Sequence, residues 1–440
     1  MPLAEGAGPV GPATANHRRG DLPCQVSRQA LLGELVAIAA DRGLDAVGVT
    51  TAEPFGDARG QIESCRRDGL DGGMQFTYRN PARSTDPRRT LEDARSLVVA
   101  ARRYPLPDSE PTPPGHGRIA AYAADDHYRA LRDGLGAVAR RLERDGYRAI
   151  VLADDNALVD RAAAERAGIG WYAKNTNIMV GTLGSWFILG SVLTDAELPP
   201  SRTYELPRSH PAPAKTKEQG CGTCTRCIDA CPTAAIVAPG VIDSRRCLAW
   251  LLQAEGAFPP EHRVALGDRI YGCDECQIVC PVNLRSARRA KSSRERAGLA
   301  TVLPRGGGPG AVGSGAAAGD RSAASLVDLI ELLESDGEQL MSRYGRWYVP
   351  RRDPRYLRRN ALVVLANTGD GEDRSTARAL AACLSSDDPL VVAHAIWAAR
   401  ALGMGEMVNR IQPRMRTVVA ADPMVVAELD RGAERAAASR

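Results

Sequence analysis

The fold is decided by the run Cys221-Gly-Thr-Cys224-Thr-Arg-Cys227-Ile-Asp-Ala-Cys231-Pro232, followed by Cys247 and by Cys273-Asp-Glu-Cys276-Gln-Ile-Val-Cys280-Pro281. Both runs end in Cys-x3-Cys-Pro, which is typical of bacterial two-cluster ferredoxins, where the last cysteine of one run ligates the other cluster. The spacing therefore predicts two [4Fe-4S] clusters. The expected ligand sets are Cys221, Cys224, Cys227 and Cys280 for one cluster, and Cys231, Cys247, Cys273 and Cys276 for the other.

Zinc is the competing interpretation of these cysteines, because paired Cys-x2-Cys motifs also build four-thiolate zinc sites. Eight cysteines in two three-plus-one sets with the same ending favour clusters over zinc. The other three cysteines, Cys24, Cys65 and Cys383, are scattered and are expected to be free thiols. Thiolate-bound iron without paired spare cysteines predicts a reducing, cytoplasmic location.

Composition and the N-terminal stretch limit the other possibilities. A chain of 440 residues can form two or three domains, and its net charge of +4 does not by itself indicate nucleic acid. Arg18-Arg19 could begin a twin-arginine signal, but Gly20-Asp21-Leu22-Pro23 follows instead of an apolar core. We expect residues 1–26 to be a disordered tail, and no apolar run is long enough to span a membrane.

Residues 27–205 alternate helical and strand patterns. This alternation predicts an α/β domain with helices packed on a central sheet. No Gly-x-Gly-x-x-Gly or Walker motif is present, so a nucleotide-binding fold is not indicated. We expect helices over residues 30–40, 128–145 and 157–167, and strands over residues 46–51, 96–101, 147–153 and 185–194.

The remainder divides into three parts. Residues 206–300 are expected to form an α+β, ferredoxin-like two-cluster domain, and the aperiodic Gly, Ala and Ser tract within residues 301–325 a flexible linker. Residues 326–440 are expected to be all-α. Within them, residues 357–369 and 391–403 align at a period of 34, which favours HEAT-like repeats, the alternative being an ordinary helical cap on the cluster domain.

This order of domains resembles the epoxyqueuosine reductases, cobalamin-dependent tRNA-modification enzymes related to reductive dehalogenases. The resemblance extends from about residue 27 to 369. The motifs that carry it are Cys221-Gly-Thr-Cys-Thr-Arg-Cys-Ile-Asp-Ala-Cys-Pro-Thr233, Asp243-Ser-Arg-Arg-Cys247, Arg269-Ile-Tyr-Gly-Cys-Asp-Glu-Cys-Gln277, Arg166-Ala-Gly-Ile-Gly-Trp-Tyr-Ala-Lys-Asn-Thr176 and Gly184-Ser-Trp-Phe-Ile-Leu-Gly190.

The resemblance implies cofactors and partners. Cobalamin would bind in the N-terminal domain beside one cluster, and electrons would enter from an external low-potential donor through the clusters. The substrate would be the anticodon loop of a tRNA, and we expect a monomer that does not bind membranes. The residues that match the family's cobalamin pocket are Lys174, Asn175, Ala249, Cys273, Asp274, Glu275 and Cys276.

The sequence departs from the family at the proton donor. The family usually shows Tyr-Ala-x-Gly-Arg-Asp-Tyr-His with the aspartate as donor, whereas this chain has Tyr122-Ala-Ala-Asp-Asp-His-Tyr-Arg129. Ungapped alignment places His127 at the aspartate position and Asp126 one residue earlier. Histidine can donate a proton near neutral pH, so the role could be preserved. The alternatives are a paralogue with another substrate and a solvated turn in which Asp125 or Asp126 caps a helix.

A basic and aromatic segment is the candidate tRNA-binding surface. Arginine supplies phosphate contacts, and aromatic rings stack on unpaired bases, here Tyr344, Trp347, Tyr348 and Tyr356. The alternative is a solvated basic face on an arginine-rich chain. The arginines that we predict to contact tRNA are Arg343, Arg346, Arg351, Arg352 and Arg358.

Three classes of function are compatible with the sequence. The first is a cobalamin- and iron-sulfur-dependent reductase of epoxyqueuosine in tRNA. The second is a corrinoid reductase of a small molecule, against which the basic helical tail argues. The third is a non-enzymatic electron carrier, which would need only residues 221–281 and would leave the large domain before them unexplained.

Overall fold

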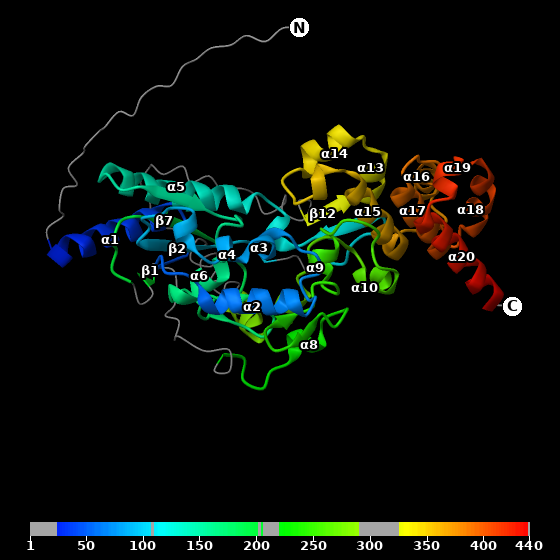
Figure 1. The fold of residues 1–440 in the computed structure, drawn as a ribbon. Coiled ribbons are helices and arrows are strands. Elements are labelled where there is room, and N and C mark those ends of the chain that lie inside the picture. The colour runs from blue at the N-terminus through cyan, green and yellow to red at the C-terminus, as the bar shows by residue number, and fades with distance from the viewer. Residues whose placement is uncertain (1–23, 107–109, 201–203, 206–219, 290–324, 439–440) are drawn as a thin grey trace, which may run out of the picture.

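The computed structural model describes residues 24–106, 110–200, 204–205, 220–289 and 325–438. The molecule is elongated (Figure 1). A sheet flanked by helices forms one end, the C-terminal helices form the other end, and the cysteine-bearing segments lie between them. Among these described ranges, no helix combines the length and the apolar character that crossing a membrane requires.

The central sheet of the N-terminal domain has five strands in the order β4-β7-β2-β1-β8. All of its pairings are antiparallel, as where Ser96 of β2 faces Thr194 of β7. The predicted layering of helices on a sheet is confirmed, but the α/β class is wrong in strand direction, because apolar periodicity reports burial and not direction. The strands are β1 (Ala46–Thr51), β2 (Ser96–Arg103), β4 (Ala149–Leu152), β7 (Phe187–Thr194) and β8 (Tyr204–Glu205).

Helices cover both faces of this sheet, so its strands are buried on both sides. Val98 of β2 packs with Leu35 and Leu135 on one face, and its neighbour Val99 packs with Ala163 on the other, because successive strand residues point to opposite faces. The helices of the domain are α1 (Cys24–Asp41), α2 (Gly56–Arg67), α3 (Phe76–Arg79), α4 (Pro81–Ser84), α5 (His127–Arg144) and α6 (Asp160–Arg166), with the 3-10 turns η1 (Pro87–Arg89) and η2 (Ala121–Ala123).

Two predicted boundaries in this domain are wrong. Helix α1 begins at Cys24, so the predicted tail loses residues 24–26 to the helix, and its residues 1–23 lie outside the described ranges. Helix α6 begins at Asp160 and not at Ala157, because residues 153–159 form a non-helical stretch of bends and a turn, in which Asp154 has a φ of +56°.

The cysteine segment folds into short elements around its loops. These are α8 (Arg226–Asp229), β9 (Ile236–Ala238), β10 (Val241–Ile242), α9 (Leu248–Leu251), η3 (Pro260–His262), α10 (Arg263–Leu266), β11 (Arg269–Tyr271), α11 (Glu275–Ile278) and a helical segment over residues 281–289. A hairpin of the N-terminal domain, β5 (Trp171–Tyr172) and β6 (Ile178–Met179), packs against Cys221 and Cys280.

A second sheet, in the order β11-β3-β12, takes one strand from each of the three predicted domains. Strand β3 (His116–Ile119) pairs in parallel with β11 and antiparallel with β12 (Leu326–Asp328). The cysteine segment and the C-terminal helices consequently share one hydrophobic core.

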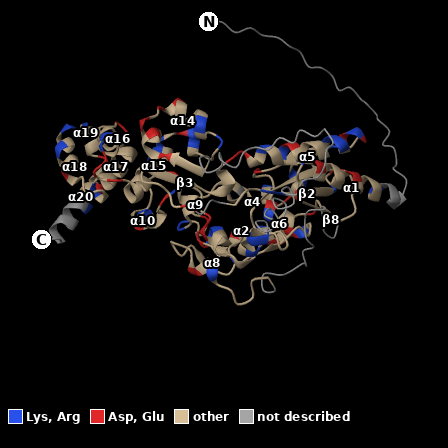
Figure 2. Cartoon of the chain, turned by 180° about the vertical axis from the view of Figure 1, so that it is seen from behind, with Lys and Arg blue, Asp and Glu red and all other residues tan. Residues whose placement is uncertain are grey.

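The C-terminal part is helical, with helices packed side by side (Figures 1 and 2). Helices α15 and α17 begin 34 residues apart, at Arg355 and Pro389, and pack against each other. Whether these helices are of the HEAT type stays a prediction, and residues 301–324 of the predicted linker lie outside the described residues. The elements are α13 (Leu329–Glu334), α14 (Gly337–Tyr344), η5 (Pro350–Arg352), α15 (Arg355–Thr368), α16 (Arg374–Leu384), α17 (Pro389–Ala401), α18 (Gly405–Ile411), η6 (Gln412–Arg414), α19 (Thr417–Ala420) and α20 (Pro423–Ala438).

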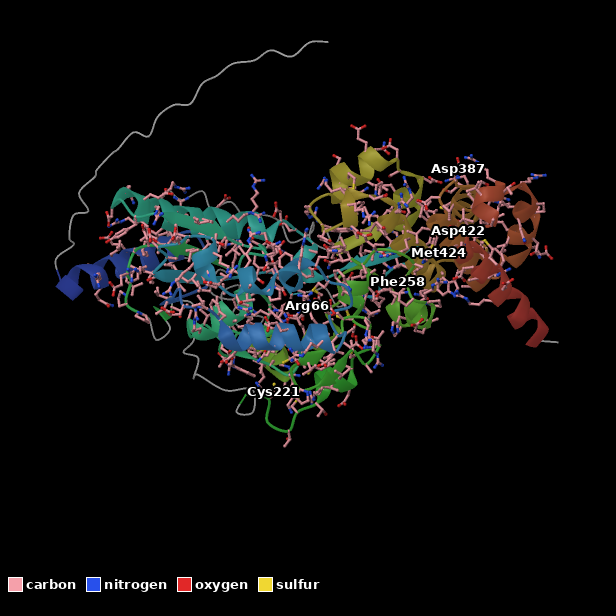
Figure 3. The ribbon with its side chains drawn as sticks, viewed as in Figure 1. Arg66, Cys221, Phe258, Asp387, Asp422 and Met424 are labelled. Atoms are coloured by element: carbon pink, nitrogen blue, oxygen red, sulfur yellow. The ribbon has the colours of Figure 1, made fainter. Side chains whose placement is uncertain are left out.

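Buried polar contacts join these helices to the cysteine segment. Arg263 of α10 forms an ion pair with Glu428 of α20 at 2.7 Å, and both side chains are buried. The backbone N–H of Phe258 donates to His394 Nε2 at 3.0 Å, and Figure 3 shows Phe258 where the two parts meet. Fully buried Arg359 donates to four backbone carbonyls of residues 251–256.

Candidate metal centre and active site

The structure gathers Cys221, Cys224, Cys227 and Cys280 into one group, the first cysteine group. Burial and, after it, the neighbouring thiolates of Cys221, Cys280 and Cys224 together raise the pKa of Cys227 to about 11. Cys280 therefore lies with the cysteines of the earlier run, as the crossover predicts. Cys221 is labelled in Figure 3, at the edge of the molecule away from the C-terminal helices.

Cys231, Cys247, Cys273 and Cys276 form the second cysteine group. The pKa of Cys273 is raised to about 12, mainly by burial and in smaller part by the charge of Cys247. Burial also raises the pKa of Cys247, although hydrogen bonds from the backbone of Trp250 and Ala249 lower it. Cys231 is a further neighbour of Cys247. The thiolate forms that ligate a metal centre are costly to bury at these positions unless the metal's charge stabilises them.

Four thiolates are the ligand number of a [4Fe-4S] cluster and also of a structural zinc ion. Within the described ranges, no three Cys, His, Asp or Glu side chains lie close enough together to hold one metal ion as they stand. Each group has four cysteines, the number that ligates a [4Fe-4S] cluster.

Two predicted cofactor residues hold the cysteine loops in place. Lys174 Nζ donates to the carbonyl oxygens of Gly222 at 2.7 Å and Cys224 at 3.0 Å. Asn175 is buried, and its Nδ2 donates to the carbonyl oxygen of Cys276 at 3.1 Å. Each residue thus ties one cysteine group to the turn after β5.

The loop of the second group is fixed by buried polar contacts. Asp274 accepts from the backbone N–H of Ala121 at 2.7 Å and from Gln277 Nε2 at 3.1 Å, and burial raises its pKa to about 6. Gly272 has a φ of +74°, and a Cβ there would lie 2.5 Å from the Cβ of Ala120. Only glycine fits this close approach to the segment before α5. The neighbouring Glu275 is paired with Arg269.

The two catalytic candidates have different surroundings. Asp126 is the N-cap of α5 and accepts from the backbone N–H of Arg129 at 3.0 Å. The ring of His127 stacks on Tyr104 with 5.8 Å between centroids, and burial lowers its pKa below the ordinary value, against the opposing charge of Asp125. The side chain of Tyr104 is in turn hydrogen-bonded to Gln277. The Tyr104 ring therefore links His127 to the loop of the second cysteine group.

A further group, absent from the sequence predictions, lies near the start of α5. We define the tyrosine-aspartate cluster as Tyr122, Tyr128, Asp154 and Asp160. Burial raises the pKa of Tyr128, and the charges of Asp154 and Asp160 raise it further. Asp274 and Asp154 are both neighbours of Tyr122, so the cluster adjoins the second cysteine group.

Asp160 is the unusual member of this cluster. Its Oδ1 is sealed from solvent and has no hydrogen-bond partner among the described residues. Burial, reinforced by the charges of Asp154 and Asp155, raises the pKa of Asp160 well above its ordinary value. A carboxylic acid in these surroundings keeps its proton at higher pH, as a general acid requires. The sequence signal was the acidic turn Asp154-Asp155 before an Asp-Arg pair, which periodicity alone does not single out.

The predicted tRNA arginines all have partners within the chain. Arg343 pairs with Glu331 at 2.6 Å, Arg351 with Glu255 at 2.6 Å, and Arg358 donates to the carbonyl oxygen of Ser335 at 2.8 Å. Arg352 donates to the carbonyl oxygen of Gly345 at 3.2 Å. Basic and acidic residues are mixed along the ribbon around α14 (Figure 2).

Three of the four aromatic residues predicted to stack on bases are buried, which corrects that prediction. Tyr344, Trp347 and Tyr356 lie in the core shared with the cysteine segment, and only Tyr348 is exposed, at 52%. Arg346 Nη2 donates to the carbonyl oxygens of Ala123 and Ala124 at 3.1 and 3.0 Å. These arginine and tryptophan side chains therefore support the segment that leads to His127.

Sequence and structure comparisons show which known proteins this chain is similar to. Residues 220–283 match the family described as a 4Fe-4S double cluster binding domain. An epoxyqueuosine reductase from Xanthomonas campestris pv. campestris is 31% identical over 372 residues, which cover 82% of this chain and 93% of that protein. The chain belongs to the epoxyqueuosine reductase family. A member from Bacillus anthracis is 28% identical and aligns over 91% of this chain and 96% of its own length.

Solved structures of the family show the same fold. One, a crystal structure of epoxyqueuosine reductase with an epoxyqueuosine-modified tRNA-Tyr stem loop, has a TM-score of 0.74 and 26% identity, and the match covers 92% of this chain and 99% of that one. Another, from Bacillus subtilis with its catalytic loop swung out of the active site, has a TM-score of 0.72 and 26% identity.

Proposed function

We propose that this protein reduces epoxyqueuosine in tRNA to queuosine. The observation that carries the proposal is the position of the tyrosine-aspartate cluster beside the second cysteine group, in a chain related to epoxyqueuosine reductases over most of its length. The reaction opens an epoxide and leaves an alkene. Two electrons and two protons are consumed, and the epoxide oxygen leaves as water.

The eight cysteines would hold two [4Fe-4S] clusters in the predicted sets. When bound, the clusters supply one-electron reducing equivalents at low potential. The chain's own contribution is to fix the loops, through Lys174 for the first group and through Asn175 and Asp274 for the second. Burial of the second group keeps water away from the reacting centre.

The residues present also fit cobalamin. A corrin carries many carboxamide groups, which need polar partners in a protein. The tyrosine-aspartate cluster supplies the hydroxyl group of Tyr122, a neighbour of Asp274 in the Cys273–Cys276 loop, and the unpartnered Oδ1 of Asp160. We propose that these residues, with Ala249, hold the corrin, and that Lys174 and Asn175 act through the loops they bind. When bound, cobalamin supplies the low-potential reductive chemistry of the reaction.

The proton donor is proposed to be His127 or Asp160. His127 occupies the motif position, but burial lowers its pKa and reduces the imidazolium fraction near neutral pH. Asp160 retains its proton more readily, because its pKa is raised well above the ordinary value. Asp126 is assigned to helix capping, since its side chain already accepts from the backbone of Arg129.

The part of the chain that we propose to contact tRNA is η5 together with the nearby Tyr348. Arg351 and Arg352 have φ angles of +52° and +55°, and non-glycine residues in this region cost about 1 kcal/mol or more each. Strain of this kind is concentrated at functional sites. Next to exposed Tyr348, the two arginines could contact a phosphate and a base together. We propose Arg343, Arg346 and Arg358 as supports of this surface.

Anaerobic reconstitution tests the function. The purified chain, loaded with iron, sulfide and cobalamin, is assayed with titanium(III) citrate on tRNA that carries epoxyqueuosine. We expect queuosine to form only when cobalamin is present. Absence of queuosine from a preparation with full iron and bound cobalamin would overturn the proposal, and turnover of a small epoxide but not of the tRNA would indicate a different substrate.

A further inference from the structure

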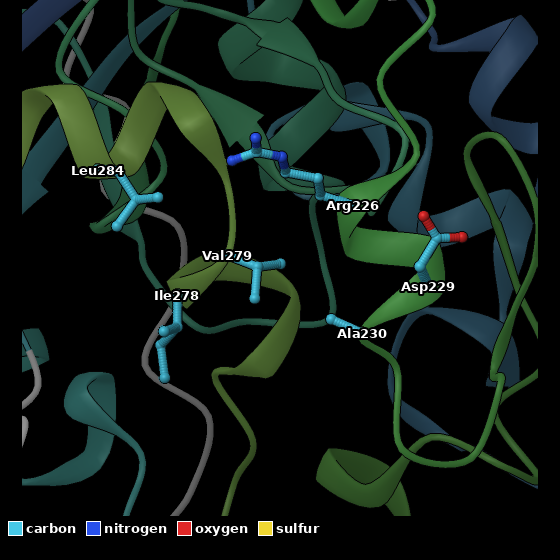
Figure 4. A pocket seen from close by; sticks show the side chains of 6 residues that line it. All are labelled: Arg226, Asp229, Ala230, Ile278, Val279 and Leu284. Carbon is cyan, nitrogen blue, oxygen red and sulfur yellow. The ribbon is translucent and has the colours of Figure 1, made fainter.

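An open depression of about 580 Å³ lies on the surface beside the first cysteine group. It is lined by Arg226, Asp229, Ala230, Ile278, Val279 and Leu284, and Figure 4 shows these side chains. The lining comes from two segments far apart in the sequence, helix α8 and the stretch from α11 into the helical segment 281–289. In Figure 4, Arg226 reaches from α8 toward the segment that carries Leu284.

The depression adjoins the first cysteine group directly. Arg226 precedes Cys227, and Val279 precedes Cys280. Both cysteines belong to the first group, whereas the tyrosine-aspartate cluster adjoins the second. The two groups thus present different sides of the cysteine segment, one toward this depression and one toward the proposed active site.

The depression is lined mainly by apolar side chains, with Arg226 and Asp229 as its charged residues, and two more arginines lie on the helical segment that carries Leu284. Ile278, Val279 and Leu284 supply apolar surface, and Leu284 is 38% exposed. Arg226, Arg285 and Arg288 are exposed and form no hydrogen bond or ion pair with any residue that the structure describes. Arg288 follows Leu284 by one helical turn and so lies on the same face. Asp229, the acidic residue of the lining, accepts from the hydroxyl of Thr225.

We propose that this depression is the docking site of an acidic electron-carrier protein, an inference that rests on the proposed reductase function. A carrier with an acidic rim around an apolar patch would complement both features, and unpaired arginines would steer its approach. Apolar floor residues favour a protein over RNA, which is bound mainly through phosphates and stacked bases. Each docking delivers one electron, and the carrier is oxidised by one electron. Two dockings supply the two electrons that the epoxide consumes.

The test is binding of a reduced bacterial flavodoxin to the iron-loaded protein, measured by calorimetry at two salt concentrations. Arg285→Glu with Arg288→Glu leaves the ligand run untouched and should weaken binding about tenfold, with a smaller dependence on salt. Arg226→Glu with Arg288→Glu should act similarly. The matched control is Arg410→Glu with Arg414→Glu, an equal charge change on exposed arginines of the C-terminal helices, which should bind like the wild type.

Reduction kinetics provide the second measurement. Flavodoxin should reduce the Arg285/Arg288 variant more slowly than the wild type, whereas titanium(III) citrate should reduce both at the same rate. Equal flavodoxin binding by variant and wild type, or loss of tRNA binding instead, would overturn the inference. The proposed function fails separately, if titanium(III) citrate supports no queuosine formation by the wild type.

Discussion

The two cysteine groups differ in what surrounds them. The first group lies beside an open depression flanked by unpaired arginines and is held by the flexible, charged side chain of Lys174. The second group is buried between Asn175, Asp274 and the aromatic residues before α5. The difference indicates that electrons enter at the exposed first group and are used at the buried second group.

Replacement of the crossover cysteine Cys280 should have the largest effect on iron content and activity. Cys280→Ser should damage the first group, although Cys280 is close in sequence to Cys276 of the second, and activity should be lost. The wild type should contain about eight irons and eight acid-labile sulfides, and the variant about four, as two separate [4Fe-4S] clusters require. Iron, sulfide and paramagnetic resonance measurements check this. A count of about four in the wild type, or zinc as the main metal, would contradict it.

Variants of His127 and Asp160 distinguish which of the two residues is the proton donor. If His127 donates, His127→Ala should cost about 100-fold or more in kcat, and turnover should fall as pH rises through the lowered pKa of His127, below its ordinary value of 6.5. His127→Asp should then retain activity with a shifted pH profile. Single-turnover rates between pH 5 and 9 provide the measurement.

If Asp160 donates, Asp160→Asn should be the inactive variant and His127→Ala should stay active. Turnover should then fall as pH rises through the raised pKa of Asp160. Asp126→Ala serves as the control, because it removes a helix cap worth about 1 kcal/mol of stability and no proposed chemistry. Full activity of both the Asp160 and the His127 variants would place the chemistry elsewhere.

Charge reversal on the proposed tRNA surface should weaken tRNA binding moderately and should leave both cysteine groups unchanged. Arg351→Glu with Arg352→Glu should weaken tRNA binding about tenfold and lower the slope of log affinity against log salt by about 1 to 2, since each lost phosphate contact removes counterion release. Iron content should be unchanged. Arg410→Glu with Arg414→Glu again supplies a charge-matched control, and equal tRNA affinity for the two variants would leave η5 as a solvated basic face.

Loop anchoring should give the smallest and most selective effects. Lys174→Met removes two hydrogen bonds to the loop of the first group, each worth about 1 kcal/mol, and should speed iron release from that group several-fold. Asn175→Ala should do the same for the second group. Chelator challenge, followed by resonance signals assigned to each cluster, checks this selectivity. Equal effects of both variants on both clusters would remove the contrast in anchoring.

Local patterns in the sequence were sufficient for the cysteine groups and for four of the five strands of the central sheet. Cysteine spacing depends on short loops, so it predicts a grouping that the structure also has, including the distant Cys280. Strand β1 begins and ends where its apolar run does. Strand direction was missed, because a buried strand has the same pattern in a parallel and in an antiparallel sheet.

Side chains whose role depends on distant neighbours were not predictable. Trp347 belongs to a basic, aromatic segment, yet its ring stacks on Tyr271 at 4.5 Å and its Nε1 donates to the carbonyl of Ala123. Asp160 is one of many acidic residues in the sequence, and only the fold seals its Oδ1 beside Tyr128. Both depend on contacts between separate parts of the chain, which composition and periodicity do not record.

The sheet β11-β3-β12 imposes an order on folding during synthesis. Strand β3 leaves the ribosome early, but its parallel partner β11 follows about 150 residues later and β12 about 210 residues later. At the usual 5–20 residues per second, β3 waits about ten seconds or more before both edges are paired. The N-terminal sheet can form in that interval. The segment that leads from β3 to His127 is completed only when the chain beyond residue 328 has emerged.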